Sequence, residues 1–217
     1  AKDLHTSHDH QLERRWQHRE TQTVVGQTAL IVGTGAIGRE TARLLSAVGM
    51  EVRGAGRRAR DGDPEFGEVV ESTNLAEHVG WADHVVIAAP LTEQTRGLVD
   101  ASVLAAMKPT AHLVNIGRGE IVDEEALLDA LTSGGIAAAS LDVFGTEPLP
   151  DDSPLWTAPG MVVSPHMSGD VVGWRDTLAR QFVANAHRFL DGQSLVNVVD
   201  KRLGFVPADT SRSTRDR

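Results

Sequence analysis

A glycine-rich hexamer at residues 33–38 (GTGAIG) constrains the fold of this chain more than any other feature. An apolar run of strand length, residues 27–32, ends at the hexamer, and the residues after it carry apolar side chains at helical spacing. In this context Gly33 permits a tight turn, Gly35 lets the backbone approach a pyrophosphate, and Gly38 lets helix and strand pack closely. The hexamer therefore predicts a dinucleotide-binding loop, with a glycine-rich turn that binds nothing as the alternative.

Strand and helix patterns continue to alternate along the rest of the chain. We expect strands at residues 27–32, 51–54, 68–71, 84–88, 112–115, 136–141 and 161–163. We expect helices at residues 9–19, 37–48, 74–79, 101–107, 123–131 and 175–190. Such alternation implies parallel strands joined by right-handed crossovers, and strands that are apolar on both faces fit a sheet covered on both sides. The sequence thus predicts an α/β fold with a doubly wound parallel sheet of the Rossmann type, in which ligands bind beyond the carboxyl ends of the strands.

The composition excludes several kinds of site and partner. The 217 residues include no cysteine, which excludes disulfides, thiolate catalysis and zinc–thiolate sites, and no tyrosine, which excludes a tyrosine acid. Acidic residues outnumber basic ones by 30 to 21, and the formal charge of −9 disfavours nucleic acids and anionic membranes as partners. No apolar run approaches the roughly 20 residues of a membrane span, and no signal-peptide pattern is present. We therefore expect a cytoplasmic protein.

Two features that resemble metal sites have simpler interpretations. Four histidines near the start of the chain match no firm ligand spacing, and a solvated helix face explains them better: His5, His8, His10 and His18. Residues 61–65 (DGDPE) resemble a calcium loop only in composition, so we expect a turn there. The sequence gives no reason to expect a bound metal.

Three residues after the second predicted strand bear on the choice of cofactor. In dinucleotide-binding folds this strand ends in an acid that binds the ribose hydroxyls, but here the position is Gly56, followed by Arg57 and Arg58. No carboxylate repels a 2′-phosphate at this point, and two guanidinium groups can bind it. We therefore expect NADP(H) as the preferred cofactor and NAD(H) as the second choice. A solvated basic loop is the alternative interpretation.

Polar residues follow three later strands: Arg118 after residues 112–115, Glu147 after 136–141, and His166 after 161–163. If these strands are neighbours, the three side chains point into one crevice. A guanidinium can bind a carboxylate through two hydrogen bonds, and an imidazole supported by a carboxylate can donate a proton near neutral pH. Next to a nicotinamide, this set suits the reduction of a 2-keto acid. Arg118 would bind the substrate carboxylate and polarise the ketone, and His166, supported by Glu147, would deliver the proton.

Each of these residues also has a structural interpretation. His166 could be an ordinary hydrogen-bonding residue of a loop, and Glu147, which precedes Pro148, could be a turn residue. Arg118 could cap a helix or pair with Glu120. All three interpretations would have to hold together for the site to have no function, which the predicted phosphate loop disfavours.

Several stretches together resemble a known family. They are residues 32–38 (VGTGAIG), 82–92 (ADHVVIAAPLT), 92–98 (TEQTRGL), 115–124 (NIGRGEIVDE), 141–149 (LDVFGTEPL) and 165–169 (PHMSG). As a set they resemble the nucleotide-binding part of the D-isomer-specific 2-hydroxyacid dehydrogenases, over about residues 16–199. The glycine and two arginines at residues 56–58 are similar to the glyoxylate/hydroxypyruvate reductase-like branch, which favours NADPH.

The resemblance implies roles for individual residues. The family's catalytic arginine, glutamate and histidine fall on Arg118, Glu147 and His166. It implies that Asp142 lies near the nicotinamide carboxamide. The remaining cofactor contacts that it implies are Ala36 and Ile37 at the pyrophosphate, Pro90, Thr95, Ile116, Gly117 and Gly169 along the groove, and Arg118 and His166 themselves. It also implies a homodimer.

The resemblance further implies how the chain is divided. Residues 1–20, with Trp16, would be a helix crossing from a substrate-binding domain, and residues 21–170 the NAD(P)-binding domain. Residues 171–200 would form the helix that crosses back, and residues 201–217 a disordered tail. Because chains of the family are longer, we expect the substrate domain to be largely missing here. Such a chain should bind NADPH but turn over poorly by itself.

Three hypotheses about function follow. The leading one is an oxidoreductase that transfers a hydride between NADP(H) and a short 2-keto or D-2-hydroxy acid, similar to glyoxylate or hydroxypyruvate. The second is a binding module that senses nicotinamide nucleotides, as corepressor-like relatives of the family do. The third is a structural remnant that binds nothing, in which case neither nicotinamide cofactor would shift the melting temperature.

Overall fold

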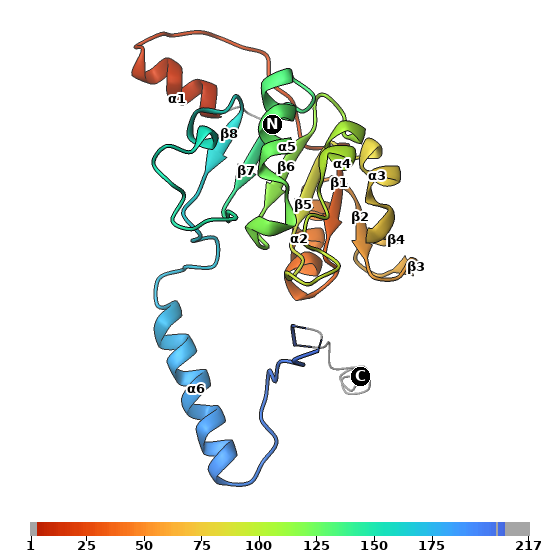
Figure 1. Ribbon diagram of the computed structural model, residues 1–217, viewed down its shortest axis with the longest axis vertical. Helices are drawn as coiled ribbons and strands as arrows, with labels where there is room; N and C mark the ends of the chain where they lie inside the picture. The colour runs from red at the N-terminus through yellow and green to blue at the C-terminus, as the bar shows by residue number, and fades with distance from the viewer. Residues whose placement is uncertain (1–3, 203, 207–217) are drawn as a thin grey trace.

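A single eight-stranded sheet forms the centre of the protein in the computed structural model, which describes residues 4–202 and 204–206 (Figure 1). The strand order is β3-β4-β2-β1-β5-β6-β7-β8. The strands are β1 (Thr28–Val32), β2 (Glu51–Gly56), β3 (Arg60–Asp63), β4 (Gly67–Glu71), β5 (His84–Ile87), β6 (His112–Asn115), β7 (Ala138–Leu141) and β8 (Met161–Val163). Every neighbouring pair is parallel except β3–β4. The predicted doubly wound parallel sheet is therefore confirmed.

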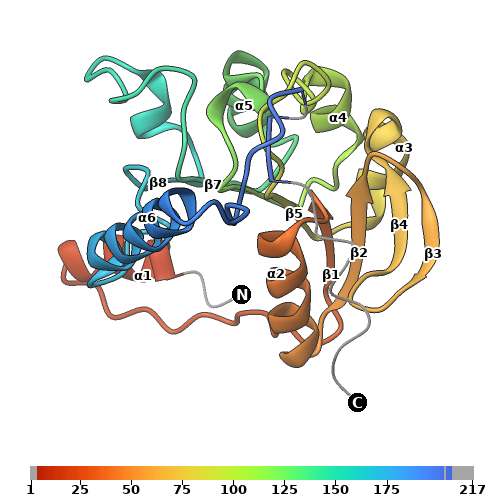
Figure 2. The same cartoon turned by 90° about the horizontal axis from the view of Figure 1, so that it is seen from below.

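Helices cover both faces of this sheet (Figure 2). The α-helices are α1 (Leu4–Leu12), α2 (Ala36–Ala47), α3 (Leu75–His78), α4 (Ala101–Ala106), α5 (Glu124–Ser133) and α6 (Trp174–Leu190). Short 3₁₀ turns occupy Ser72–Asn74, Val79–Trp81, Gly119–Ile121 and Pro154–Thr157. On one face Ala42 of α2 packs against Ile31 of β1. On the other, Leu75, Leu104 and Leu127 from α3, α4 and α5 join the larger core.

Helix α5 shows how the sequence sets the ends of an element. The Asp123 side chain accepts hydrogen bonds from the backbone N–H groups of Glu125 and Ala126, each at 3.1 Å, and so caps the first turn. Gly134 adopts the left-handed conformation, φ 73°, and ends the helix. Ile136 then donates its N–H back to Ala130 O, and strand β7 begins only at Ala138, two residues later than the sequence predicts.

Two sequence predictions are wrong at this level. The expected helix over residues 9–19 lies earlier, as α1, and Trp16 is 99% exposed in an irregular segment. The helix ends where Arg14 takes a positive φ of 54°, because this polar stretch has too few apolar side chains to pack a helix against the core. The expected turn at residues 61–65 is instead the end of β3 and the turn into β4, since Asp63 is buried and pairs with two arginines.

Helix α6 lies apart from the sheet, and Figure 1 shows it projecting away from the other elements. It follows the prediction for residues 175–190, yet none of its residues is buried within the described part of the chain. Its apolar side chains, such as Phe182 at 74% exposure, therefore contact little of the described protein. Beyond it, Asp200 and Phe205 form an antiparallel bridge. The tail predicted to be disordered covers residues 201–217, of which residues 203 and 207–217 lie outside the described residues. None of the described helices has the length and apolar character that crossing a bilayer requires.

Candidate active site

The loop between β1 and α2 has the close packing that the glycine pattern predicts. Gly33 has a φ of 109°, and a Cβ added there would lie 2.6 Å from Ala89 N at the end of β5. A Cβ at Gly38 would lie 1.9 Å from Gly33 O, so any larger residue would push α2 away from β1. These two glycines allow the helix and two strands to meet, as the sequence analysis expects.

Gly35 differs from its two neighbours in the motif, because a Cβ there would meet nothing within 4 Å. It is the residue before α2, which begins at Ala36 and Ile37, and the first N–H groups of a helix have no partner within it. Open space over these donors fits a pyrophosphate, whose negative charge also suits the positive end of the helix. The residues present therefore fit the phosphates of a dinucleotide.

An open pocket of about 480 Å³ lies beyond β2, lined by Thr34, Arg57, Arg58, Arg60 and Gln94. Gly56 is the last residue of β2, and a Cβ there would point at Thr34 Oγ1, 3.1 Å away. An acidic side chain at position 56 would therefore enter this pocket, where three guanidinium groups gather instead.

The sequence analysis identifies Arg57 and Arg58 but misses Arg60, Thr34 and Gln94, which line the same pocket. Arg60 lies on β3, a strand that the sequence does not predict. Gln94 comes from the loop after β5, within the stretch 92–98 that carries part of the family resemblance, but nothing in that stretch points to this pocket.

Of the three predicted catalytic residues, His166 and Glu147 are in direct contact. His166 Nδ1 lies 2.6 Å from Glu147 Oε2, and Glu147 Oε1 accepts the backbone N–H of Phe144 at 2.9 Å. Burial alone would raise the pKa of Glu147, but the bonds from His166 and Phe144, with the charges of His166 and Arg118, lower it. The carboxylate is thus held ionised with both oxygens bound. The predicted pairing of histidine and glutamate is present in the fold.

Arg118 is brought towards this pair by a rigid loop after β6. Asn115, with no exposed surface, accepts the Gly117 N–H at 2.9 Å and donates to Arg118 O at 3.0 Å. A Cβ at Gly119 would lie 1.9 Å from the carbonyl carbon of Phe144, so the loops carrying Arg118 and Glu147 are pressed together. Asn115 opens the stretch 115–124 that carries part of the family resemblance, but only the fold shows that its side chain is buried and bridges this loop.

Asp142 holds the loop that carries His166. Its Oδ1 accepts Ser164 Oγ–H at 2.5 Å and Met167 N–H at 3.0 Å, and its Oδ2 accepts Ser168 N–H at 2.9 Å. Burial alone would raise the pKa of Asp142, but these bonds from Ser164, Ser168 and Met167 lower it to about 2. The predicted contact of Asp142 with a nicotinamide stays a prediction. What the structure adds is that this carboxylate fixes a loop in which His166 has a positive φ of 51°.

The other predicted cofactor contacts come after the carboxyl ends of three strands. Thr95 Oγ donates to Pro90 O at 2.7 Å in the loop after β5. Ile116 donates its N–H to Ile87 O at 3.0 Å, and a Cβ at Gly117 would lie 2.7 Å from Ala89 O. Gly169, after β8, has nothing within 4 Å of its Cβ position. They follow the strand ends that the sequence predicts, and their contacts with a cofactor stay predictions.

The histidines near the start of the chain do not all follow the prediction. His8 and His18 are exposed, as expected, but His10 is 8% exposed. His18 lies outside α1, and the His5 side chain lies outside the described residues. Among the residues that the structure describes, no three His, Cys, Asp or Glu side chains come together in a group that could hold a metal ion.

Known proteins that resemble this chain belong to a family of dehydrogenases. The sequence model of the D-isomer specific 2-hydroxyacid dehydrogenase NAD binding domain matches residues 1–168. A glyoxylate reductase from Thermococcus gammatolerans is 37% identical over 182 residues, which cover 83% of this chain and 53% of that protein. This chain therefore spans about half the length of the curated relatives it matches.

Solved structures show the same relation. A D-isomer specific 2-hydroxyacid dehydrogenase from Xanthobacter autotrophicus, in complex with NADPH and MES, is 36% identical with a TM-score of 0.81, covering 94% of this chain and 64% of that one. An NADPH-dependent glyoxylate/hydroxypyruvate reductase from Sinorhizobium meliloti, in complex with NADP and sulfate, is 29% identical with a TM-score of 0.82, covering 93% and 64%. The chain thus belongs to the D-isomer specific 2-hydroxyacid dehydrogenase family and contains its NAD-binding domain.

Proposed function

We propose that this chain is the cofactor-binding part of an oxidoreductase that transfers a hydride between NADP(H) and a short 2-keto or D-2-hydroxy acid. The contact between His166 and Glu147, 2.6 Å long and close to the Arg118 loop, is the observation that carries the proposal. The names of the relatives, glyoxylate reductase and glyoxylate/hydroxypyruvate reductase B, support a small keto acid such as glyoxylate or hydroxypyruvate as the substrate.

The cofactor would lie along the carboxyl edge of the sheet. The open backbone at Gly35 suits the pyrophosphate, and the pocket with Arg57 and Arg58 suits the 2′-phosphate of NADP(H). The NADPH and NADP complexes of two solved relatives support this choice, with NAD(H) as the second cofactor. When bound, the nicotinamide supplies the hydride in reduction and accepts it in oxidation.

The chain's own residues would handle the substrate charge and the proton. Arg118 binds the substrate carboxylate through its guanidinium group and polarises the adjacent carbonyl. His166 gives its proton to the carbonyl oxygen as the carbon is reduced, and takes the hydroxyl proton in the reverse direction. Glu147 orients the imidazole through Nδ1, so that the other ring nitrogen faces the substrate.

The test is NADPH and NADH consumption by the complete gene product with a panel of 2-keto acids that includes glyoxylate and hydroxypyruvate. We expect turnover with at least one acid and a preference for NADPH. No turnover of any acid with either cofactor would overturn the proposal. Tight NADPH binding without turnover, lost on Arg57→Ala, would instead favour a nucleotide-sensing binding module.

We also propose that the protein is a homodimer in the cytoplasm. Three exposed apolar side chains support burial against a further polypeptide surface: Leu44 of α2, Val48 directly after α2, and Phe182 of α6. The absence of cysteine is compatible with any redox compartment, so cell fractionation has to test the location. Light scattering of the purified protein tests the assembly, and a monomer mass at micromolar concentration would contradict the dimer.

A further inference from the structure

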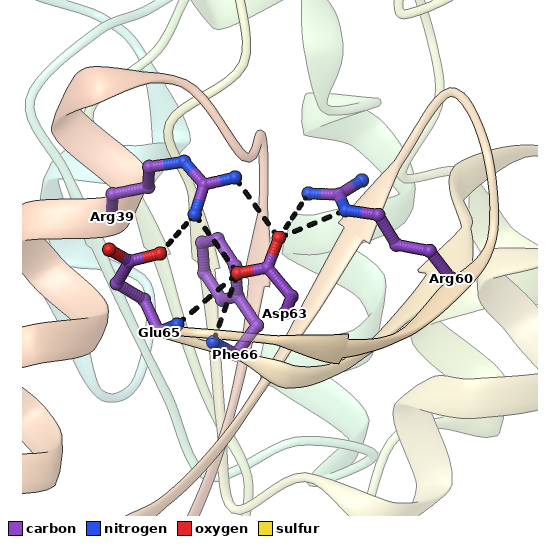
Figure 3. Close-up of polar contacts among 5 residues, drawn as sticks. All are labelled: Arg39, Arg60, Asp63, Glu65 and Phe66. Carbon is purple, nitrogen blue, oxygen red and sulfur yellow. Dashed lines mark hydrogen bonds and ion pairs between the residues drawn. The ribbon is translucent and has the colours of Figure 1, made fainter. Parts of the chain in front are cut away.

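The buried carboxylate of Asp63 connects the helix of the phosphate loop with the arginine pocket (Figure 3). The Asp63 side chain is only 3% exposed. From α2, Arg39 donates to both of its oxygens, Nη1 to Oδ1 at 2.9 Å and Nη2 to Oδ2 at 3.0 Å. From β3, Arg60 donates Nε and Nη2 to Oδ2, at 2.9 and 2.7 Å. Two arginines from different elements are thus bound to one buried carboxylate.

Asp63 itself is held firmly by its surroundings. Its Oδ1 accepts the backbone N–H groups of Glu65 and Phe66, at 3.2 and 3.4 Å, which closes the turn between β3 and β4. The Glu65 carboxylate makes an ion pair with Arg39, and the Arg39 guanidinium lies 5.5 Å from the centre of the Phe66 ring. Both oxygens of the Asp63 carboxylate are therefore bound, and Arg39, one of its partners, is itself held by Glu65 and Phe66.

This arrangement fixes the direction in which Arg60 points. Both bonds to Asp63 use the Nε and Nη2 edge of the guanidinium, and Figure 3 shows the third nitrogen turned away from the carboxylate. Within residues 4–202 and 204–206, Nη1 of Arg60 has no hydrogen-bond partner. Arg60 also lines the pocket with Arg57 and Arg58. A guanidinium that already has one edge bound therefore offers its other donors to whatever enters this pocket.

The charges around the pocket favour an anion. The Arg39, Arg57, Arg58 and Arg60 guanidinium groups are balanced only by Asp63 and Glu65 within this cluster, so an excess of positive charge remains on the pocket side. A phosphate dianion in this pocket would meet three arginines. Arg57 and Arg58 make no hydrogen bond to a carboxylate of the cluster, whereas Arg60 is already held by Asp63. Holding a long side chain in place before the ligand arrives reduces the conformational entropy lost on binding.

We propose that Asp63 is a positioning residue for the cofactor's 2′-phosphate: it holds Arg60 so that the free donors of this arginine bind the phosphate together with Arg57 and Arg58. The inference rests on the proposed function, because it assumes that the pocket receives the 2′-phosphate of NADP(H). It adds a third arginine to the recognition of this phosphate and makes the β3–β4 hairpin part of the cofactor site. It follows that Asp63 affects discrimination between NADPH and NADH without touching either cofactor.

Calorimetric titration of the purified chain with adenosine 2′,5′-bisphosphate and with 5′-AMP tests this proposal directly. The two probes differ in the 2′-phosphate and need no turnover. The wild type should bind the bisphosphate at least about tenfold more tightly than 5′-AMP, the scale of one charge-assisted hydrogen bond or more. Asp63→Asn should lower the affinity for the bisphosphate about tenfold and leave that for 5′-AMP within about twofold. Arg60→Gln should show the same selective loss, and the double variant should lose no more than Arg60→Gln alone.

Asp83→Asn is the matched control, since Asp83 also binds a cation, Lys108 Nζ at 2.7 Å, and a threonine, Thr28, but at the amino ends of β1 and β5, away from the pocket. Asp83→Asn should bind adenosine 2′,5′-bisphosphate and 5′-AMP as tightly as the wild type does. If the wild type does not distinguish the two probes, the cofactor assignment is wrong irrespective of Asp63. If the wild type does distinguish them and Arg60→Gln retains the preference, the inference about Asp63 is overturned.

Two further outcomes separate positioning from a purely structural role. Equal loss of both probes in Asp63→Asn, with the discrimination unchanged in Arg60→Gln, would show that Asp63 only holds the hairpin together, and would overturn the proposal. If Asp63→Asn does not fold, Arg60→Gln decides alone, because it leaves the bonds between Asp63 and Arg39 in place.

Discussion

His166 is fixed through one ring nitrogen, which leaves the other for chemistry. Its Nδ1 contacts Glu147, and Nε2 has no hydrogen-bond partner among the described residues. We expect His166→Ala to lower kcat by about 10²–10⁴-fold, because general acid catalysis contributes on this scale. NADPH affinity should change little, since the phosphate loop and the arginine pocket are untouched. Steady-state kinetics and fluorescence titration of NADPH measure the two effects, and unimpaired turnover would refute the assigned role.

Arg57 and Arg58 carry the second prediction at the residue scale. Replacing both with glutamine should raise KM for NADPH by up to about 100-fold, because each charge-assisted hydrogen bond is worth about tenfold. KM for NADH should stay within about threefold, so the preference shifts toward NADH. Lys108→Gln, which changes a cation that binds Asp83 before the start of β5, is the control. An unchanged preference in the double variant would show that the 2′-phosphate binds elsewhere.

Functional residues that follow a predicted strand can be found from the sequence, whereas residues whose role depends on being buried cannot. Arg118, Glu147 and His166 could be identified because each directly follows an apolar run that forms a strand. Asp63 could not, since it lies in a charged stretch that is typical of a surface turn, and only the fold shows that it is buried. Arg60 was missed for the same reason. A buried carboxylate with two arginine partners has no signature in a single sequence.

At the scale of elements, the loop after β8 depends on the Asp142 carboxylate. The pKa of Asp142 in the folded protein is about 2, against 3.8 for an ordinary aspartate, so the folded state favours the ionised form. Its contribution to stability is therefore complete above about pH 5 and is lost as the pH falls from about 4 towards 2. A lowering of this size corresponds to about 2 kcal/mol near neutral pH.

Asp142→Asn should therefore reduce the free energy of unfolding by about 2 kcal/mol at pH 7 and by about half as much at pH 3, where the wild type has lost about half of the contribution. Urea denaturation at the two pH values measures this difference. Glu124→Gln is a useful comparison, because Glu124 binds only one backbone N–H, that of Gly145. A loss for Asp142→Asn that is the same at both pH values would contradict the electrostatic account.

The elements that sequence patterns predict well are those with an apolar side facing the sheet. Strand β6 has the predicted bounds, and α5 lies within two residues of the predicted helix over residues 123–131. The sequence does not predict β3, because this strand is polar and its Asp63 is buried by a contact with Arg39, 24 residues away. It misplaces α1, because that polar segment has few apolar side chains to fix the bounds of a helix. Hydrophobic periodicity therefore predicts the buried layers of this fold and not its edges.

At the scale of the whole molecule, the sheet and helices α2 to α5 of the described chain share a hydrophobic core, whereas α6 packs none of its side chains into it. The periodicity of α6 predicts an amphipathic helix, and the structure confirms the helix, with the apolar Leu178, Phe182 and Leu190 exposed. What covers these side chains cannot follow from the sequence of this helix, because a hydrophobic stripe does not specify its partner.

The segment beyond α6 connects the end of the described chain to the cofactor pocket, and Figure 1 shows it turning back toward the sheet. The guanidinium of Arg57 lies 5.1 Å from the centre of the Phe205 ring. A Cβ at Gly204 would be 3.9 Å from Leu91 O, which places the segment beside the loop after β5 as well. Stacking on an aromatic ring restricts a guanidinium and leaves the donors on its edges available to a phosphate.

We therefore expect Phe205→Ala to weaken NADPH binding about two- to fivefold, the scale of an exposed cation–π contact, and to weaken NADH binding much less. In a variant that already lacks Arg57, the same substitution should have no effect on NADPH, because the two residues act through one contact. Fluorescence titration of both cofactors across this double-mutant cycle measures the coupling. Phe189→Ala, on the exposed face of α6, is the control and should leave both affinities unchanged. Equal weakening of NADPH and NADH by Phe205→Ala would show that the segment contacts the cofactor at a place other than the 2′-phosphate.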